Sequence, residues 1–302
     1  MKALNRMIYR WISKRFMDGC SDYNPLTVRK ASRTKQQARD IFKQLEIPHA
    51  EGLVFVNPIQ ALRFVKRYGF PVVVKPNVSG YSRGSHFPIN NRKDLWKALL
   101  AVKIWWPSSV IEQYLKGKNY RVVVVKNEIM SVIRRYPPFV TGNGQSTIAE
   151  LIEQENQVRQ EMNLYPVIHP IAKNRSTQAF LKKQGYALDS IPGEGQVVEL
   201  HNKVALAPGG VVETIDKRTI APENRMLFLK TLSALDANIF GIDVILEKGI
   251  EHPYTEQNCI FLELNSRPYL KMHHSPRFGQ AEDLRPYIQQ LETIELADAG
   301  VF

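Results

Sequence analysis

The stretches FGIDVIL, residues 240–246, and CIFLELN, residues 259–265, decide the fold of this chain. Both are short apolar runs typical of buried strands, yet Asp243 lies inside the first, and Glu263 and Asn265 end the second. Oxygen ligands that converge in this way suit Mg²⁺, which completes its coordination with water and nucleotide phosphates. Taken singly, each acid would more often be a paired carboxylate in the core or at a strand edge. Together they favour a site for a cation and a nucleotide.

A second candidate for phosphate binding follows the apolar strand FPVVVK, residues 70–75. The strand ends at Lys75 and leads, after Pro76, into the glycine- and serine-containing loop NVSGYSRGS, residues 77–85. Backbone amides of such a loop can approach phosphate oxygens closely, while Lys75 supplies a point charge and Arg83 a forked donor. The loop alone would more often be a hairpin connection, and Lys75 beside it strengthens the phosphate interpretation.

A short connection between two apolar strands, VIEQYL at residues 110–115, precedes GKNYRVVVV. Its residues Glu112, Gln113, Tyr114 and Leu115 can present backbone groups to the edge of an adenine ring, although any interdomain hinge would have the same composition. Lys35, in SRTKQQAR, is by itself a solvated helix residue.

Composition limits the class of protein. The 302 residues are 44% hydrophobic, which suffices for one large core or two smaller ones, and no run is long enough to span a membrane. A net charge of +12 favours an anionic partner, but no motif for sequence-specific nucleic-acid binding occurs. The start of the chain does not resemble a signal peptide, and two cysteines are too few for a disulfide framework. We therefore expect a cytoplasmic globular protein.

Periodicity predicts helices and strands in irregular alternation, without the strict βαβ repeat of a Rossmann sheet, and so favours an α+β class. A basic amphipathic helix over residues 2–16 would dock on the protein's own core, on a partner or on an anionic membrane surface. The other predicted helices cover 34–45, 59–68, 95–102, 148–160, 177–184 and 223–236. The predicted strands cover 53–56, 72–75, 110–114, 120–125, 128–134, 196–200, 240–246 and 259–265.

Motifs along most of the chain share one order with a known family. They are SRTK, FPVVVKP, SGYSRGS, VIEQYLKGKNYRVVVV, RRYPPFVTGNGQSTIAELI, APGG, GIDV, ELNSRP and KMHHSP. With these motifs the chain, from about residue 32 to residue 280, resembles the ATP-grasp ligases. Within that family it is similar to the ATP-grasp domain of cyanophycin synthetase and of the bifunctional glutathione synthetases.

The resemblance implies an ATP-grasp fold, in which two α+β subdomains hold the nucleotide between them. The expected organisation is an N-terminal helix and linker at residues 1–30, a small lid subdomain at 31–115, a C-terminal subdomain at 116–290 and a tail at 291–302. A full N-terminal domain of the kind that precedes the ATP-grasp domain in the family is not expected, because only about thirty residues precede the matched region.

The resemblance also implies roles for particular residues. Lys35 and Lys75 match the paired phosphate lysines, and Glu112 to Leu115 match the adenine hinge. The flexible lid corresponds to the loop that contains Gly80, Arg83, Gly84 and Ser85. The implied magnesium ligands are Asp243, Glu263 and Asn265. The implied residues of the phosphate and substrate cleft are Arg121, Arg135 and Lys271.

The implied reaction transfers the γ-phosphoryl group of ATP to a carboxylate, and an amine then attacks the acylphosphate to form an amide. ATP and Mg²⁺, expected as two ions with Mn²⁺ as an alternative, are the implied cofactors. The expected substrates are amino acids or peptides, with a partner protein that supplies the acceptor, and the chain is expected to form a homo-oligomer. Two alternatives stay open: an ATP-binding scaffold that acts through its N-terminal helix, and a kinase for a small-molecule hydroxyl.

Overall fold

The computed structural model describes residues 23–77 and 84–294. The predicted helix over residues 2–16 and the lid residues Gly80 and Arg83 lie outside the described residues. The chain divides into two compact units. Unit 1 contains residues 1–132, 216–270 and 283–302, and unit 2 contains residues 133–215 and 271–282. This division does not follow the boundary expected after residue 115, so the subdomain bounds derived from the sequence stay a prediction.

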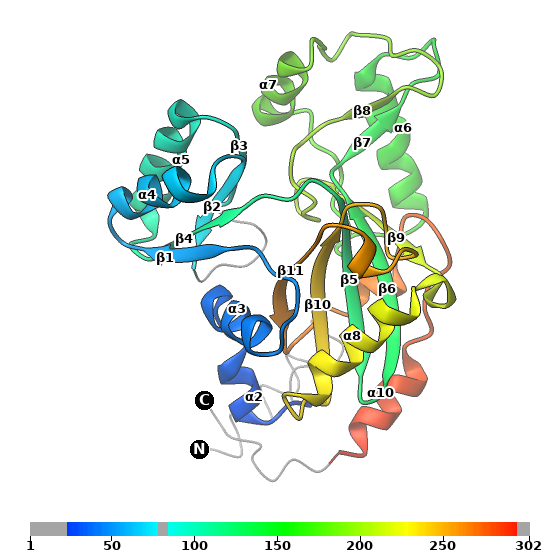
Figure 1. Ribbon diagram of the computed structural model, residues 1–302. Helices are drawn as coiled ribbons and strands as arrows, with labels where there is room; N and C mark the ends of the chain where they lie inside the picture. Colours follow the sequence, from blue (N-terminus) through cyan, green and yellow to red (C-terminus); the bar gives the residue numbers. More distant parts are fainter. Residues whose placement is uncertain (1–22, 78–83, 295–302) are drawn as a thin grey trace, which may run out of the picture. The chain divides into compact units, whose positions relative to one another are not determined.

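The first sheet of unit 1 has four antiparallel strands in the order β1-β4-β2-β3. The strands are β1 (Gly52–Phe55), β2 (Val72–Pro76), β3 (His86–Ile89) and β4 (Ser109–Gln113). Side chains alternate across the sheet, and Val72, Val74 and Ile111 share the face that packs against two helices. These helices are α4 (Pro58–Tyr68) and α5 (Arg92–Trp105), which Figure 1 shows beside this sheet. The opposite face therefore carries Lys75 and Glu112.

Local sequence signals explain where these helices begin. Asn57 and Gln60 form a capping box at the start of α4, where Pro58 occupies a position that needs no backbone donor. The side chain of Asn91 accepts a hydrogen bond from the amide of Asp94 at the start of α5. Both helices then bury one apolar face against the sheet.

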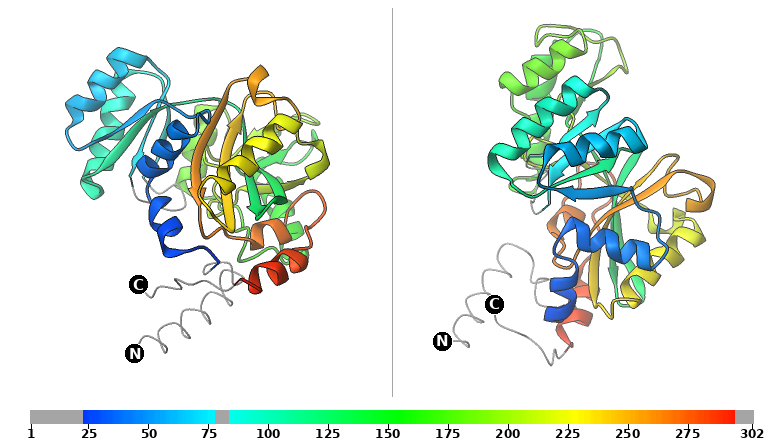
Figure 2. Two further views of the ribbon diagram at one scale, coloured as in Figure 1. Left: turned by 60° about the horizontal axis from the view of Figure 1, so that its bottom comes forward. Right: turned by 60° about the vertical axis from the view of Figure 1, so that its left-hand side comes forward.

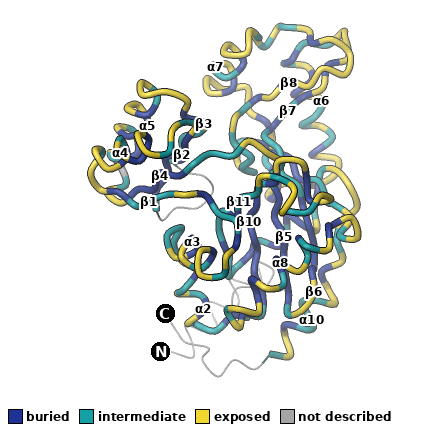
Figure 3. The backbone as a smooth tube through the Cα atoms, in the orientation of Figure 1, coloured by how far each residue is buried: buried dark blue, intermediate teal, exposed yellow. Residues whose placement is uncertain are grey.

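The second sheet has the strand order β11-β10-β5-β6-β9. Its strands are β5 (Lys118–Val125), β6 (Glu128–Tyr136), β9 (Val211–Ile215), β10 (Ile239–Leu246) and β11 (Cys259–Asn265). The run from Val122 to Val125 is fully buried on both faces, as expected for an uninterrupted apolar strand, and Figure 3 shows the continuous burial of β5 and β10.

Helices of unit 1 pack against this second sheet. Helix α8 (Pro222–Ser233) contacts β5 and β10, and helix α3 (Lys35–Gln44) contacts β11. Helix α10 (Arg285–Glu292) contributes Leu291 to a cluster that includes Val123 and Ile239. A short helix, α2 (Leu26–Ala31), precedes α3. Two further views show the same elements in Figure 2.

Unit 2 has its own apolar core. Strand β7 (Phe139–Thr141) pairs with β8 (Val197–Glu199), and helices α6 (Ile148–Glu161) and α7 (Arg175–Lys183) pack on them through buried residues such as Ile148 and Leu181. Thr147 and Glu150 form a capping box at the start of α6, which the sequence places at Ser146 or Thr147. Unit 2 also contains the end of β6, strand β9 and the short helix α9 (Lys271–His274).

The α+β prediction is confirmed, and each predicted helix or strand within the described residues is present, β11 with the predicted bounds and the others with one or both ends shifted. Among the described residues, the sequence missed the α-helices and strands α2, β3, β7, β9, α9 and α10 and the 3₁₀ helices η2 (Lys217–Thr219) and η3 (Tyr254–Glu256). Among the residues that the structure describes, no helix is both long and apolar enough to cross a membrane.

Candidate nucleotide and metal site

Three charged side chains form a row across the strands of the second sheet. Asp243 on β10 lies opposite Arg121 on β5 and opposite Glu263 on β11. Residues directly opposite each other in antiparallel strands share a face of the sheet. Asn265 lies two residues after Glu263 and therefore joins them on that face.

Arg121 holds Asp243 with two hydrogen bonds. Its Nε donates to Asp243 Oδ1 at 2.6 Å, and its Nη2 donates to Asp243 Oδ2 at 2.8 Å. Both residues are buried, and Arg121 Nη2 also lies 3.6 Å from Glu263 Oε1. Burial, the largest single effect, lowers the pKa of the Arg121 guanidinium, but the charge and hydrogen bonds of Asp243 and the charge of Glu263 together outweigh burial, so the pKa is raised. Asp243 is thus the paired core carboxylate that the sequence left as an alternative.

Asn265 and Gly241 complete this face. Asn265 Nδ2 donates to Gly241 O at 3.4 Å and to Glu263 Oε1 at 3.3 Å. A Cβ atom built on Gly241 would lie 2.9 Å from Pro268 Cβ and 3.6 Å from Arg121 Cδ. The missing side chain at Gly241 therefore leaves room for Pro268, whereas 3.6 Å to Arg121 is an ordinary van der Waals contact.

A register shift next to the acids places Phe261 and Glu263 on opposite faces. Asp243 pairs with Glu263, but Val244 pairs with Phe261, so Leu262 is the extra residue of a bulge. Without this bulge, strict alternation would place both residues on one face. With it, the ring of Phe261 is buried, with its centroid 5.6 Å from that of Phe42 and 5.7 Å from that of Phe228.

Basic residues gather around Glu112 on the polar face of the first sheet. Lys75 Nζ forms an ion pair with Glu112 Oε2, and Arg39 Nη1 lies 3.4 Å from Glu112 Oε1. All three side chains are buried. Arg39 belongs to α3, one helical turn after Lys35.

The pKa of Lys35 depends on charges of both sheets, those around Glu112 and that of Glu263. Burial lowers the pKa of its ammonium group; Lys75 lowers it further, whereas the carboxylates of Glu263 and Glu112 raise it. Lys35 is therefore close enough to Lys75, Glu112 and Glu263 for their charges to change its pKa, and we call these four residues of unit 1 one electrostatic neighbourhood.

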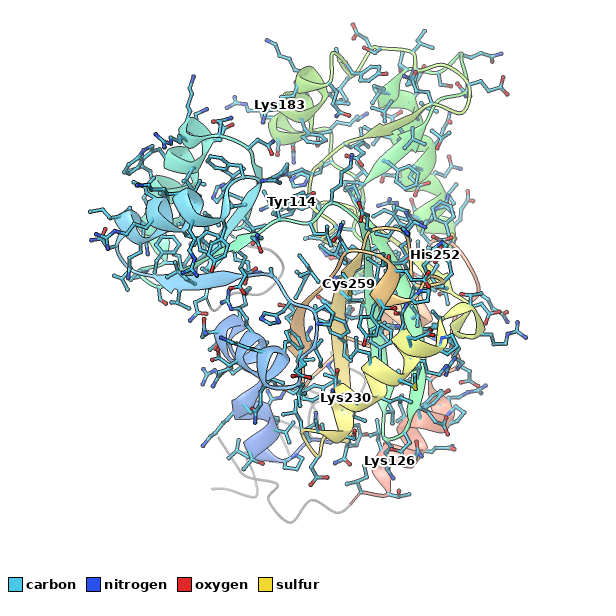
Figure 4. The ribbon with its side chains drawn as sticks, in the orientation of Figure 1. Tyr114, Lys126, Lys183, Lys230, His252 and Cys259 are labelled. Atoms are coloured by element: carbon cyan, nitrogen blue, oxygen red, sulfur yellow. The ribbon has the colours of Figure 1, made fainter. Side chains whose placement is uncertain are left out.

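The connection after β4 leaves the backbone amide of Leu115 available as a donor. The amide of Gln113 donates to Glu51 O at 3.0 Å, and the amide of Tyr114 donates to Pro71 O at 3.1 Å. Among the described residues, the amide of Leu115 has no hydrogen-bond acceptor. The ring of Tyr114, labelled in Figure 4, stacks on Phe87 with 6.2 Å between the centroids.

The remaining predicted site residues lie elsewhere. Gly84 has a φ of +68°, and a Cβ there would lie 2.5 Å from the Trp106 ring, while Ser85 beside it is buried. Arg135 and Lys271 belong to unit 2.

The ligand set is compatible with Mg²⁺. Among residues 23–77 and 84–294, no three His, Cys, Asp or Glu side chains gather in a metal-binding group. A cation here would take the carboxylates of Asp243 and Glu263, the amide oxygen of Asn265, water and phosphate oxygens. Mg²⁺ is usually bound by one or two carboxylates in addition to water and phosphates, so these residues fit it.

Arg39 and Gly52 were not predicted from the sequence. A Cβ on Gly52 would lie 1.8 Å from Arg39 Nη1 and 2.6 Å from Glu112 Cγ, so the guanidinium occupies the space above this glycine. The available signal for Arg39 was the helical wheel of α3, on which Arg39 lies next to the buried residue Phe42, at the edge of the apolar face.

Comparison with known proteins shows which proteins the chain resembles. Residues 41–165 match the family described as D-ala D-ala ligase C-terminus. A cyanophycin synthetase of Trichormus variabilis is 31% identical over 249 residues, which cover 81% of this chain and 27% of that protein. A glutathione biosynthesis bifunctional protein of Clostridium perfringens is 30% identical over 251 residues, which cover 82% of this chain and 32% of that protein.

In sequence, the chain is similar to part of the ATP-grasp ligases.

Solved structures confirm the ATP-grasp fold. A bifunctional glutathione synthetase from Pasteurella multocida matches with a TM-score of 0.64 and 23% identity, over 89% of this chain and 38% of that chain. A D-alanine–D-alanine ligase from Bacillus anthracis matches with a TM-score of 0.52 and 14% identity, over 89% of this chain and 66% of that chain. This ATP-grasp chain spans about a third or less of the length of the two curated relatives named above.

Proposed function

We propose that the chain is an ATP-dependent ligase that joins a carboxylate to an amine through an acylphosphate. The observation that carries the proposal is the row of Asp243 and Glu263, with Asn265 beside them, in the electrostatic neighbourhood of Lys35. The buried and half-buried charges nearby are four cations, Lys35, Arg39, Lys75 and Arg121, and three carboxylates, Glu112, Asp243 and Glu263. This excess of positive charge suits an anionic triphosphate.

Each residue has a proposed role in binding. Lys35 and Lys75 neutralise phosphate oxygens, and Asp243, Glu263 and Asn265 hold Mg²⁺, which supplies charge neutralisation for phosphoryl transfer. The amide of Leu115 donates to the adenine edge, as part of the hinge formed with Glu112, Gln113 and Tyr114. The loop that contains Gly80, Arg83, Gly84 and Ser85 acts as the lid.

The proposed chemistry has two steps. A carboxylate oxygen attacks the γ-phosphorus, the bond to the β-phosphate bridging oxygen breaks, and ADP leaves. An amine then attacks the acyl carbon, phosphate leaves, and the nitrogen loses a proton. Because positioning and charge neutralisation supply most of such catalysis, Arg121, Arg135 and Lys271 are proposed to orient the phosphoryl group and the substrate. Exclusion of water by the lid would protect the acylphosphate.

The relatives' names guide the proposed substrate class. Cyanophycin synthetase, glutathione biosynthesis protein and D-alanine–D-alanine ligase are names of the proteins similar to this chain. We therefore propose amino acids or peptides as substrates. A partner protein as source of the acceptor, a homo-oligomer, cytoplasmic placement and membrane contact by residues 1–22 are further proposals.

The test measures ADP release from Mg-ATP with pooled amino acids and peptides, and identifies the products by mass spectrometry. Glu263→Gln should lower turnover by about 100-fold or more, because it removes a charged oxygen ligand while its half-buried position tolerates the amide. Glu128→Gln, at an exposed position on β6, is the matched control and should leave turnover unchanged. Near-normal turnover in Glu263→Gln would refute the assignment.

One observation favours a second function, an ATP-binding scaffold without ligase activity. Both oxygens of Asp243 accept hydrogen bonds from the buried Arg121, so the charge of this carboxylate is already balanced by a guanidinium and attracts a metal ion less strongly. Binding of Mg-ATP without release of phosphate across the whole substrate panel would favour the scaffold.

A further inference from the structure

Arg39 has an unusual environment for a buried charge. Its Nη2 donates to Gln36 Oε1 at 3.0 Å. Its Nε and Nη1 are buried and form no hydrogen bond with any described residue, although Nη1 lies 3.4 Å from Glu112 Oε1. The residue is 8% exposed. Buried donors are normally satisfied, so unsatisfied donors on a cation need an explanation.

Geometry restricts the group that can satisfy these donors. The two nitrogens are closed to solvent, so no ligand reaches them directly. The guanidinium fills the space above Gly52, and Gly52 pairs with Glu112 across β1 and β4. The Glu112 carboxylate is therefore the acceptor within reach.

Glu112 already has another partner. Its Oε2 forms an ion pair with Lys75 Nζ, and both side chains are buried. A lysine paired in this way is a weaker ligand for phosphate, and withdrawing it would leave Glu112 as a buried carboxylate without a partner. A second cation beside Glu112 removes that penalty.

We propose that Arg39 is a positioning residue that takes over Glu112 when Lys75 turns to the phosphates of a bound nucleotide. The inference rests on the proposed function, because it assumes that Lys75 binds phosphate. In the structure Glu112 is shared, with one oxygen on Lys75 and the other near Arg39. A small rotation of the carboxylate toward Arg39 would satisfy Nη1 and release Lys75. Arg39 itself does not touch the nucleotide.

The test measures binding of Mg-ADP by isothermal titration to the full chain and to variants. Arg39→Met and Arg39→Gln should each weaken binding of Mg-ADP by about tenfold or more, because Glu112 then keeps Lys75 as its partner. Both variants are neutral, and one of them suffices for the test if the other does not fold. Arg39→Lys retains a cation and should stay within about threefold of the parent. Thermal unfolding of each variant confirms that it is folded.

The decisive comparison uses Glu112→Gln, which removes the charge that needs a partner. In that background, Arg39→Met should change the affinity for Mg-ADP by less than about twofold. The inference is wrong if Arg39→Met costs the same affinity in both backgrounds, or costs none in the parent. If the parent chain itself does not bind Mg-ADP, the proposed function fails.

Discussion

Two buried arginines, Arg39 in unit 1 and Arg159 in unit 2, have similar burial but different partners. Arg159 Nη1 donates to the backbone oxygens of His169 at 2.8 Å and of Gly209 at 2.9 Å, and its Nε donates to Glu155. Within the described residues, the polar partners of Arg39 are side chains, those of Gln36 and Glu112.

The difference indicates what each arginine does. Backbone carbonyls cannot move without moving the chain, so Arg159 fixes the segments around residues 169 and 209 to helix α6. A carboxylate can rotate about its own bonds, so Arg39 next to Glu112 allows an exchange of partners. A buried guanidinium that donates hydrogen bonds to backbone carbonyls therefore indicates a role in stability. One that faces a carboxylate shared with a lysine indicates a role in function.

The largest expected effect is a loss of stability when Arg159 is replaced. Arg159→Met should lower the free energy of unfolding by about 3 kcal/mol, because it leaves backbone oxygens without donors and removes one partner of Glu155. Arg39→Met should cost about 1 kcal/mol or less, because Glu112 keeps Lys75. Urea unfolding measures both.

The matched control is Arg218→Met, since the Arg218 guanidinium pairs with Asp216 at the surface and should give no measurable change. Equal losses for Arg159→Met and Arg39→Met would remove the distinction between the two regions.

A smaller effect is expected at Gly52. In Gly52→Ala the new Cβ would lie 1.8 Å from Arg39 Nη1 and 2.9 Å from Ile111 O, which should cost about 2 kcal/mol of unfolding free energy. Part of this loss should vanish in an Arg39→Ala background, where the guanidinium is absent. Gly193→Ala is the control, because the nearest atom to its Cβ would be 3.7 Å away. The same cost in both backgrounds would show that Arg39 does not fill this space.

The smallest expected effect is on the pH dependence of stability, through Glu155, the carboxylate partner of Arg159. Burial raises the pKa of Glu155, but its hydrogen bonds to Arg277 and Arg159 outweigh burial and lower the pKa below 4.5. The unfolded state therefore binds the proton more readily, so this stabilisation is present above about pH 4.5 and is lost as the pH falls through the lowered pKa. In Glu155→Gln the free energy of unfolding should fall less steeply with decreasing pH than in the parent chain. Urea unfolding at several pH values measures this slope. An unchanged slope would contradict the argument.

The sequence predicts most of the fold because β10 and β11 are apolar runs and the helices carry capping residues. It also indicates Asp243, Glu263 and Lys75, since a charged group in or at the end of an apolar strand is visible without a structure. It does not reveal that Arg121 holds Asp243, because the two residues are 122 positions apart and meet only through strand pairing.

Two other features were hidden for local reasons. Arg39 was not singled out from the sequence, since a basic side chain on an amphipathic helix usually is exposed. Short strands such as β3 and β7, with four and three residues, lack enough length for a clear alternating pattern.

The bulge at Leu262 has a consequence for how this protein can evolve. It separates the polar end of the strand pair from the end that packs on Phe42 and Phe228. Substitutions among the acids can therefore accumulate without repacking the aromatic core, and the 247–258 connection can change in length without displacing the acids. Because of this bulge, a change at the polar end of the strand pair need not disturb the packing at the other end.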